Sequence, residues 1–120
     1  MPMSVLAILF NCSEPEAITI ALKSIQSNEG LRKHLGEAGV LLGAYANRLT
    51  PVDPSWTLAE SDASQPFRAD LSEQNFWENV IQVWVQDYGV QIVGGCCGIT
   101  PEHIAYISTR LKLDEHYERL

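Results

Sequence analysis

The sequence predicts one α/β domain built around a parallel β-sheet. Short apolar segments alternate with segments of helical periodicity, which is the order that builds parallel sheets from βα units. The apolar segments are nearly continuous, as is typical of strands covered on both faces. The 120 residues are 46% hydrophobic and 19% charged, as expected of a single packed domain.

The first strand and helix are predicted within residues 4–30. Residues 4–10 (SVLAILF) form the apolar strand. The next helix begins at Ser13, because a serine followed three residues later by Glu16 is a capping box. It ends near residues 28–30, where Asn, Glu and Gly follow the last apolar position. Its apolar stripe repeats at helical spacing and consists of Ile18, Ala21, Leu22 and Ile25.

A second strand is predicted at residues 40–46 (VLLGAYA), after a short helical turn at 31–35. Its small residues Gly43 and Ala44 indicate close packing against a neighbouring element. Residues 48–71 form a long polar connection, and connections of that length in compact domains are usually functional or disordered. We expect two aromatic residues to fasten it, Trp56 and Phe67.

A second long helix and a third strand follow this connection. Ser72 caps a helix over residues 73–88, and Gly89 ends it. The third strand covers residues 90–93. The buried stripe of the helix consists of Trp77, Val80, Ile81, Trp84 and Tyr88.

The residues at its N-terminus predict the last helix. Thr100 is its N-cap and Pro101 its first residue, a position where the missing N–H of proline has no intrahelical partner to lose. We expect residues 114–120 to form a frayed, charged tail. The inner face of this helix consists of Ile104, Ile107 and Leu111.

The charge balance excludes several classes of partner. Eight lysines and arginines stand against fifteen aspartates and glutamates, a formal charge of −7. This charge argues against nucleic acid and anionic membranes, whose phosphates would repel it. No segment reaches the ~20 apolar residues of a membrane span, and the apolar start lacks the basic residues of a signal peptide. We therefore expect a cytoplasmic protein.

The three cysteines follow the ends of predicted strands, Cys12 after the first, and Cys96 with Cys97 after the third. An odd number without a secretion signal favours metal or thiol chemistry over a disulfide framework. Successive parallel strands lie side by side, so the two cysteine-bearing strands are expected about 10 Å apart, with one strand between them. Converging thiolates suit Zn²⁺, which binds sulfur tetrahedrally, and three protein ligands leave one position open for catalysis.

Two other interpretations of the cysteines stay open from the residues alone. A free cysteine is often a small buried hydrophobe, which is the simpler interpretation of Cys12 taken by itself. Thiol redox chemistry is the other, although no C-x-x-C spacing supports it. We interpret the three histidines as solvated or capping residues rather than ligands, namely His34, His103 and His116.

Segments at the predicted strand ends carry a family resemblance. Residues 94–98 (GGCCG) are followed by residues 100–104 (TPEHI). Residues 11–12 (Asn-Cys) lie 84 residues before the double cysteine, and residues 45–47 read Tyr-Ala-Asn. These segments resemble the C-terminal signature, the upstream zinc cysteine and the Tyr-Pro-Asn segment of the zinc-dependent homocysteine S-methyltransferases, with alanine in place of the proline. The resemblance extends over essentially the whole chain.

The resemblance implies a site and a reaction. It implies that Cys12, Cys96 and Cys97 are ligands of Zn²⁺. It also implies that Asn11 and Asn47 contact the substrate or support the ligands, unless each only caps its strand. The implied reaction is zinc-dependent methyl transfer to the thiolate of homocysteine, giving methionine, as in methionine biosynthesis. The implied methyl donor is S-methylmethionine, S-adenosylmethionine or betaine, and the sequence does not distinguish them.

The resemblance also implies the architecture. The family has a TIM (β/α)₈ barrel, a fold of ~250 residues, and the three βα units here resemble its last three, strands six to eight. Residues 1–120 are thus expected to form a single, incomplete barrel domain that copies of this chain or a partner chain complete. The alternative is a non-catalytic zinc-binding or oligomerising remnant of such an enzyme, and a cysteine-based redox protein is a third interpretation.

Overall fold

A three-stranded parallel sheet forms the centre of the computed structural model, which describes residues 4–50 and 67–113. Both strand pairs are parallel, and Ala44 lies opposite Phe10 on one side and Val93 on the other. The predicted α/β class is confirmed, and the middle strand separates the two cysteine-bearing strands as expected. In spatial order, the strands are β1 (Ala7–Asn11), β2 (Leu41–Tyr45) and β3 (Ile92–Val93).

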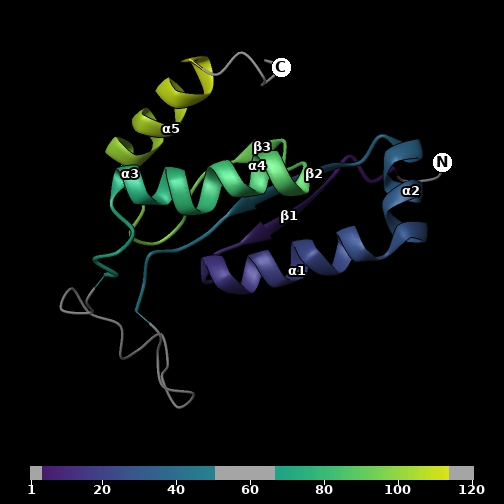
Figure 1. Ribbon diagram of the computed structural model, residues 1–120, viewed down its shortest axis with the longest axis horizontal. Coiled ribbons are helices and arrows are strands. Elements are labelled where there is room, and N and C mark those ends of the chain that lie inside the picture. The colour runs from purple at the N-terminus through teal and green to yellow at the C-terminus, as the bar shows by residue number, and fades with distance from the viewer. Residues whose placement is uncertain (1–3, 51–66, 114–120) are drawn as a thin grey trace.

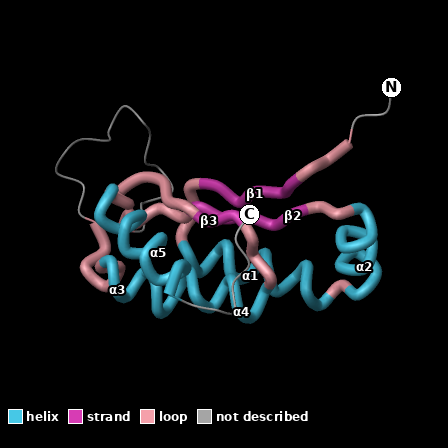
Figure 2. Tube along the Cα trace, turned by 90° about the horizontal axis from the view of Figure 1, so that it is seen from above, coloured by secondary structure: helices cyan, strands magenta, loops and turns pink. Residues whose placement is uncertain are grey.

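The main helices cover one face of this sheet. Figure 2 shows α1, α4 and α5 on the same side of the strands. Three of the segments, α3, η2 and α4, follow one another as a continuous helix with a π-helical turn in its middle (Figure 1). The helical segments are α1 (Pro15–Ser27), α2 (Glu29–Ala38), α3 (Glu73–Phe76), η2 (Trp77–Ile81), α4 (Gln82–Tyr88) and α5 (Pro101–Leu113).

The helix over residues 73–88 follows its prediction closely. The hydroxyl of Ser72 accepts a hydrogen bond from the Asn75 backbone N–H at 3.2 Å, and Gly89 ends the helix with a φ of 67°. Phe76, outside the predicted stripe, is fully buried as well. The predicted stripe packs into the core, fully buried at Trp77, Val80, Ile81 and Trp84 and half-buried at Tyr88.

The opposite face of the sheet carries no helix among the described residues. One row of side chains across the strands packs toward the helices and consists of Phe10, Ala44 and Val93. The alternate row points to the open face and consists of Leu9, Gly43 and Ile92. Leu9 is 45% exposed, so the prediction of a first strand covered on both faces is wrong for the described part of the chain. The predicted close packing at Gly43 is confirmed, since a Cβ there would lie 2.9 Å from that of Ile92.

Helix α1 begins differently from its prediction. Its N-cap is Glu14, which makes no side-chain capping bond, and Pro15 is its first residue. The hydroxyl of Ser13 donates instead to the carbonyl oxygen of the last β1 residue at 2.9 Å. The Glu16 carboxylate pairs with Arg68 at 2.7 Å. The predicted capping box is therefore wrong, because Ser13 closes the turn after β1 rather than the helix.

Helix α2 is a complete helix where the sequence predicts only a turn at residues 31–35. The side chain of Asn28 accepts a hydrogen bond from the Leu31 N–H at 3.0 Å, which starts the helix. Gly39, with a φ of 69°, ends it. None of its side chains is buried, so the capping residues define this helix more than an apolar stripe does.

Helix α5 starts as predicted, with Thr100 before Pro101 and the Thr100 hydroxyl accepting a hydrogen bond from the His103 N–H at 3.3 Å. Its inner face differs from the prediction at one position. Ile107 is buried, but Ile104 is 43% exposed and His103, at 1% exposed, takes its place in the interior. Of the two roles expected for His103, solvated or capping, the structure supports capping, because the buried ring accepts the Thr100 N–H at Nδ1 at a distance of 3.2 Å.

Three expectations lie outside the described residues, namely those for Trp56, His116 and the tail at 114–120. His34 is exposed on α2, as predicted. None of the described helices is long and apolar enough to cross a lipid bilayer.

Candidate metal centre

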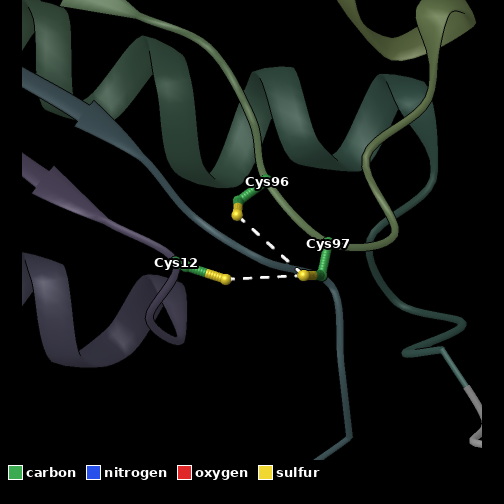
Figure 3. Close-up of side chains that lie close together, drawn as sticks. All are labelled: Cys12, Cys96 and Cys97. Atoms are coloured by element: carbon green, nitrogen blue, oxygen red, sulfur yellow. Dashed lines mark hydrogen bonds between the residues drawn. The ribbon is translucent and has the colours of Figure 1, made fainter. Parts of the chain in front are cut away.

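The three cysteines meet beyond the carboxyl ends of β1 and β3. Cys12 follows β1 directly, and the pair at 96–97 lies three residues beyond β3. Figure 3 shows their side chains converging. The Sγ atom of Cys97 lies 3.6 Å from that of Cys12 and 4.0 Å from that of Cys96. All three sulfur atoms lie within 4.8 Å of one another, so this cluster can hold a metal ion.

The backbone at Cys12 turns sharply toward the cluster. Its φ of 32° lies in the left-handed region, and among the described residues no other non-glycine residue has a positive φ. Such a conformation is uncommon for a residue with a Cβ, and it persists only where surrounding contacts hold it. Here the Cys12 N–H donates to the carbonyl oxygen of Tyr45 at 3.0 Å, which ties the turn to the end of β2.

The second loop holds Cys96 and Cys97 in a tight turn. The Cys96 N–H donates to the carbonyl oxygen of Ala46 at 2.9 Å, and its own carbonyl accepts the Ile99 N–H at 3.0 Å. The turn passes through Gly98, whose φ is 82°. A Cβ at Gly98 would lie 3.0 Å from the Phe67 ring, so this position has neither the conformation nor the room for a side chain. Glycine is therefore required at this position of the turn.

Of the two asparagines predicted near the site, the described contacts bring one to a cysteine. Asn47 is 9% exposed, and its Nδ2 donates to the Cys12 sulfur at 4.0 Å. Its Oδ1 accepts the Leu49 N–H at 3.2 Å, and its backbone N–H donates to the Ser13 carbonyl at 3.0 Å. Asn11, the last residue of β1, is exposed at the same edge of the sheet.

The pKa values of Cys12 and Cys96 shift in opposite directions. A hydrogen bond with the Cys96 thiol lowers the pKa of Cys12 against the opposing effect of burial, and Cys97 and Asn47 contribute to the lowering. The same interaction with Cys12, together with burial, raises the pKa of Cys96 to about 11. Ionised thiols this close repel one another, so the three ionise together only beside a cation. A divalent metal ion is such a cation.

The exposure of the thiols decides against one alternative. Cys97 is exposed, and Cys12 and Cys96 are partly exposed, so the interpretation as inert buried hydrophobes is wrong. All three are free cysteines, and the sulfur–sulfur distances of 3.6 and 4.0 Å are too long for a disulfide bond of about 2 Å.

The described end of the long connection lies beside the cysteine turn. Phe67 pairs with Leu49 in an isolated antiparallel bridge, and the Arg48 guanidinium lies 5.0 Å from the centre of its ring. Arg68 then binds Glu16 through two hydrogen bonds of 2.7 and 2.8 Å, and it also pairs with Asp70. Phe67 thus holds the described end of the connection, as predicted, and the Arg68 contacts add an ionic attachment that the sequence did not indicate.

Comparison with known proteins identifies one family. The family model for homocysteine S-methyltransferase matches residues 1–111, which contain all three cysteines and both asparagines. No solved structure gives a significant match to the chain.

Proposed function

The chain belongs to the homocysteine S-methyltransferase family, and we propose that it binds Zn²⁺ through Cys12, Cys96 and Cys97 for methyl transfer to homocysteine, giving methionine. The observation that carries this proposal is the convergence of three sulfur atoms from two loops 84 residues apart in sequence. A shared metal ion accounts for the convergence of these three side chains at this edge of the sheet.

The spacing of the sulfur atoms suits zinc. A tetrahedral zinc site with Zn–S distances of about 2.3 Å places its sulfur atoms about 3.8 Å apart. The distances from the Cys97 sulfur, 3.6 Å to Cys12 and 4.0 Å to Cys96, lie on either side of that value. Soft thiolates favour zinc over magnesium or calcium, and three protein ligands leave a fourth position for a substrate.

The substrate itself explains why such a position is useful. A free thiol has a pKa near 8.5 and is mostly protonated at neutral pH, which makes it a poor nucleophile. Zinc bound at this site would supply Lewis acidity that lowers the pKa of the homocysteine thiol. The expected reaction is then displacement of a methyl group from a sulfonium or ammonium donor by the homocysteine thiolate.

The residues of this chain support the site in distinct ways. The three cysteine thiolates place net negative charge around a divalent ion, which keeps a fourth sulfur ligand electron-rich. Asn47 donates a long hydrogen bond to the Cys12 sulfur, and we assign it the support of this ligand. We assign the exposed Asn11 a contact with substrate at the rim.

The open face of the sheet supports the proposal of a barrel. Three parallel strands in sequential order, with helices on one side and the cluster at their carboxyl ends, match three successive units of a (β/α)₈ barrel. Further βα units, from copies of this chain or from a partner chain, would cover Leu9 and the exposed strand edges. Free thiol ligands also suit a reducing compartment such as the cytoplasm.

Metal analysis and an assay of methionine formation test the proposal. Protein purified without chelator is expected to hold about one zinc per chain, the content of a single three-cysteine site. Cys96→Ser should lose this zinc, whereas Ser24→Ala, an exposed change on α1, should retain it. The assay combines homocysteine with S-methylmethionine, S-adenosylmethionine or betaine. Protein without metal overturns the zinc site, and zinc without turnover identifies the non-catalytic zinc-binding alternative.

A further inference from the structure

We infer that His103 is a positioning residue for the metal centre, because its imidazole joins the start of α5 to the Leu71 carbonyl and closes a ring of contacts around the Cys96–Cys97 turn. His103 does not contact the cysteines, and the proposed function gives it no role. It is nevertheless 1% exposed, with both ring nitrogens engaged.

The hydrogen bonds of His103 indicate which ring nitrogen donates and which accepts. Its Nε2 lies 2.9 Å from the carbonyl oxygen of Leu71, which can only accept, so Nε2 carries the proton. Its Nδ1 accepts the Thr100 N–H at 3.2 Å and lies 2.8 Å from the Thr100 hydroxyl. The ring of Phe76 packs edge-on against the imidazole, with the ring centres 5.9 Å apart, and fixes its plane.

The Thr100 side of this arrangement leads directly to the cysteines. Thr100 is three residues after Cys97, and between them the Ile99 N–H closes the turn on the Cys96 carbonyl. Contacts that fix Thr100 therefore also fix residues 98–99, through which the chain leaves the cysteine turn. The start of the turn is held separately, by the hydrogen bond from the Cys96 N–H to the Ala46 carbonyl oxygen.

The Leu71 side leads back to the same turn by another route. The Leu71 N–H lies 3.4 Å from the Arg68 carbonyl, and the Arg68 N–H donates to the Arg48 carbonyl at 2.8 Å. The Arg48 N–H in turn donates to the Cys97 carbonyl at 2.8 Å. Starting from Cys97, the contacts thus pass through Arg48, Arg68 and Leu71 to His103 and return through Thr100. Among the described residues, the side chain of His103 joins the two ends of this ring.

Three substitutions test separately the hydrogen bonds at the two ring nitrogens of His103. His103→Asn retains an acceptor near Nδ1 but loses the donor to Leu71, and His103→Gln retains a donor near Nε2. His103→Leu removes both. The matched control is Trp84→Phe, which removes another buried hydrogen bond, from the indole N–H to the Thr19 hydroxyl at 2.8 Å, away from the cysteines. All of these changes are expected to lower the unfolding midpoint, so stability alone does not decide.

Two readouts distinguish positioning from a general structural role. The first is Co²⁺ binding, followed by thiolate-to-cobalt absorption, since second-shell substitutions weaken metal sites by roughly 10–100-fold. His103→Leu should weaken Co²⁺ binding at least tenfold and change the spectrum, His103→Gln and His103→Asn should do so less, and Trp84→Phe should match the wild type. The second is hydrogen exchange of the Ile99 and Thr100 amides in metal-free protein, which should accelerate only in the His103 variants.

The outcomes separate this inference from the proposed function. Wild-type protein that binds no metal overturns the zinc proposal, and the exchange comparison still tests His103. Metal binding and exchange in His103→Leu equal to those in Trp84→Phe would overturn the positioning role. If His103→Leu does not fold, the Gln and Asn variants decide by the same two measurements.

Discussion

Gly98 offers the sharpest quantitative test of the cysteine turn. Gly98→Ala introduces a Cβ at a φ of 82°, 3.0 Å from the Phe67 ring and 3.1 Å from the Arg48 side chain. The left-handed conformation costs a non-glycine residue about 1–2 kcal/mol, and overpacking typically costs about 1–3 kcal/mol. The free energy of unfolding should therefore fall by about 2–5 kcal/mol.

Two other glycines provide controls that separate these contributions. Gly39 has a φ of 69°, and a Cβ added there would meet nothing within 4 Å, so Gly39→Ala should cost only the conformational part, about 1–2 kcal/mol. Gly36 lies inside α2 with the same open space, and Gly36→Ala should stabilise the helix by about 0.5–1 kcal/mol. The difference between the Gly98 and Gly39 variants isolates the crowding against Phe67 and Arg48.

Urea unfolding of metal-free protein, followed by circular dichroism, measures all three variants. Chelator competition then measures metal affinity, which should fall at least tenfold in Gly98→Ala and remain unchanged in Gly39→Ala, because only the first displaces Cys97. A Gly98 variant no less stable than the Gly39 variant, with unchanged metal affinity, would refute the account of this turn.

Three further outcomes are expected. Asn47→Ala should weaken zinc binding by about tenfold in chelator competition, because it removes the N–H donor to a ligand sulfur, and unaltered affinity would contradict that role. The pKa of Glu16 is lowered mainly by its hydrogen bonds from Arg68, so its stabilising contribution is present above the ordinary glutamate pKa and is lost as pH falls through the lowered value. Between pH 6 and pH 3, the loss of thermal stability should be smaller in Glu16→Gln than in the wild type. The difference should be less than about 1 kcal/mol, because the Glu16 side chain is 59% exposed. Leu9→Glu places a charge on the open sheet face and should lower the molar mass measured by light scattering toward that of a monomer. Ile20→Glu, at a position 66% exposed on α1, should leave the molar mass unchanged. A wild-type monomer would show that the open face binds no second copy.

The parts of the fold that follow general backbone rules could be predicted. Parallel strands bring their carboxyl ends to one edge, and this alone placed Cys12 near Cys96 and Cys97. The N-cap at Thr100 followed from the residue type and the proline after it. Each of these predictions depends on a local pattern or on topology, which the sequence encodes directly.

The parts that depend on contacts between distant side chains could not be predicted. The burial of His103 requires the Leu71 carbonyl, 32 residues away, as a partner for its second nitrogen. Glu16 and Arg68 lie 52 residues apart, and their pairing removes Glu16 from the capping box that its spacing suggests. The exposure of β1 depends on what lies against its open face, and no pattern within a strand specifies that.

The last residue of β2 and the three residues after it explain how cysteines from strands two positions apart converge. Four successive residues each make a backbone hydrogen bond to a cysteine-bearing loop: Tyr45 and Asn47 to the loop at Cys12, Ala46 and Arg48 to the loop at Cys96–Cys97. Successive residues bond the two loops in turn, as residues of a central parallel strand bond their two neighbours, so residues 46–48 continue the role of β2 beyond its last paired residue.

This arrangement is compatible with an alanine at position 46, where the family segment that residues 45–47 resemble has proline. The contact at Ala46 uses its carbonyl oxygen, which accepts the Cys96 N–H, and a proline would present the same acceptor without needing its missing N–H. The Ala46 side chain is fully buried, so the position is restricted in size as well as in conformation. Alanine in place of proline therefore preserves the hydrogen bond from the Cys96 N–H to the carbonyl oxygen of residue 46. The geometry of the cysteine cluster thus depends on residues 45–48, none of which is a cysteine.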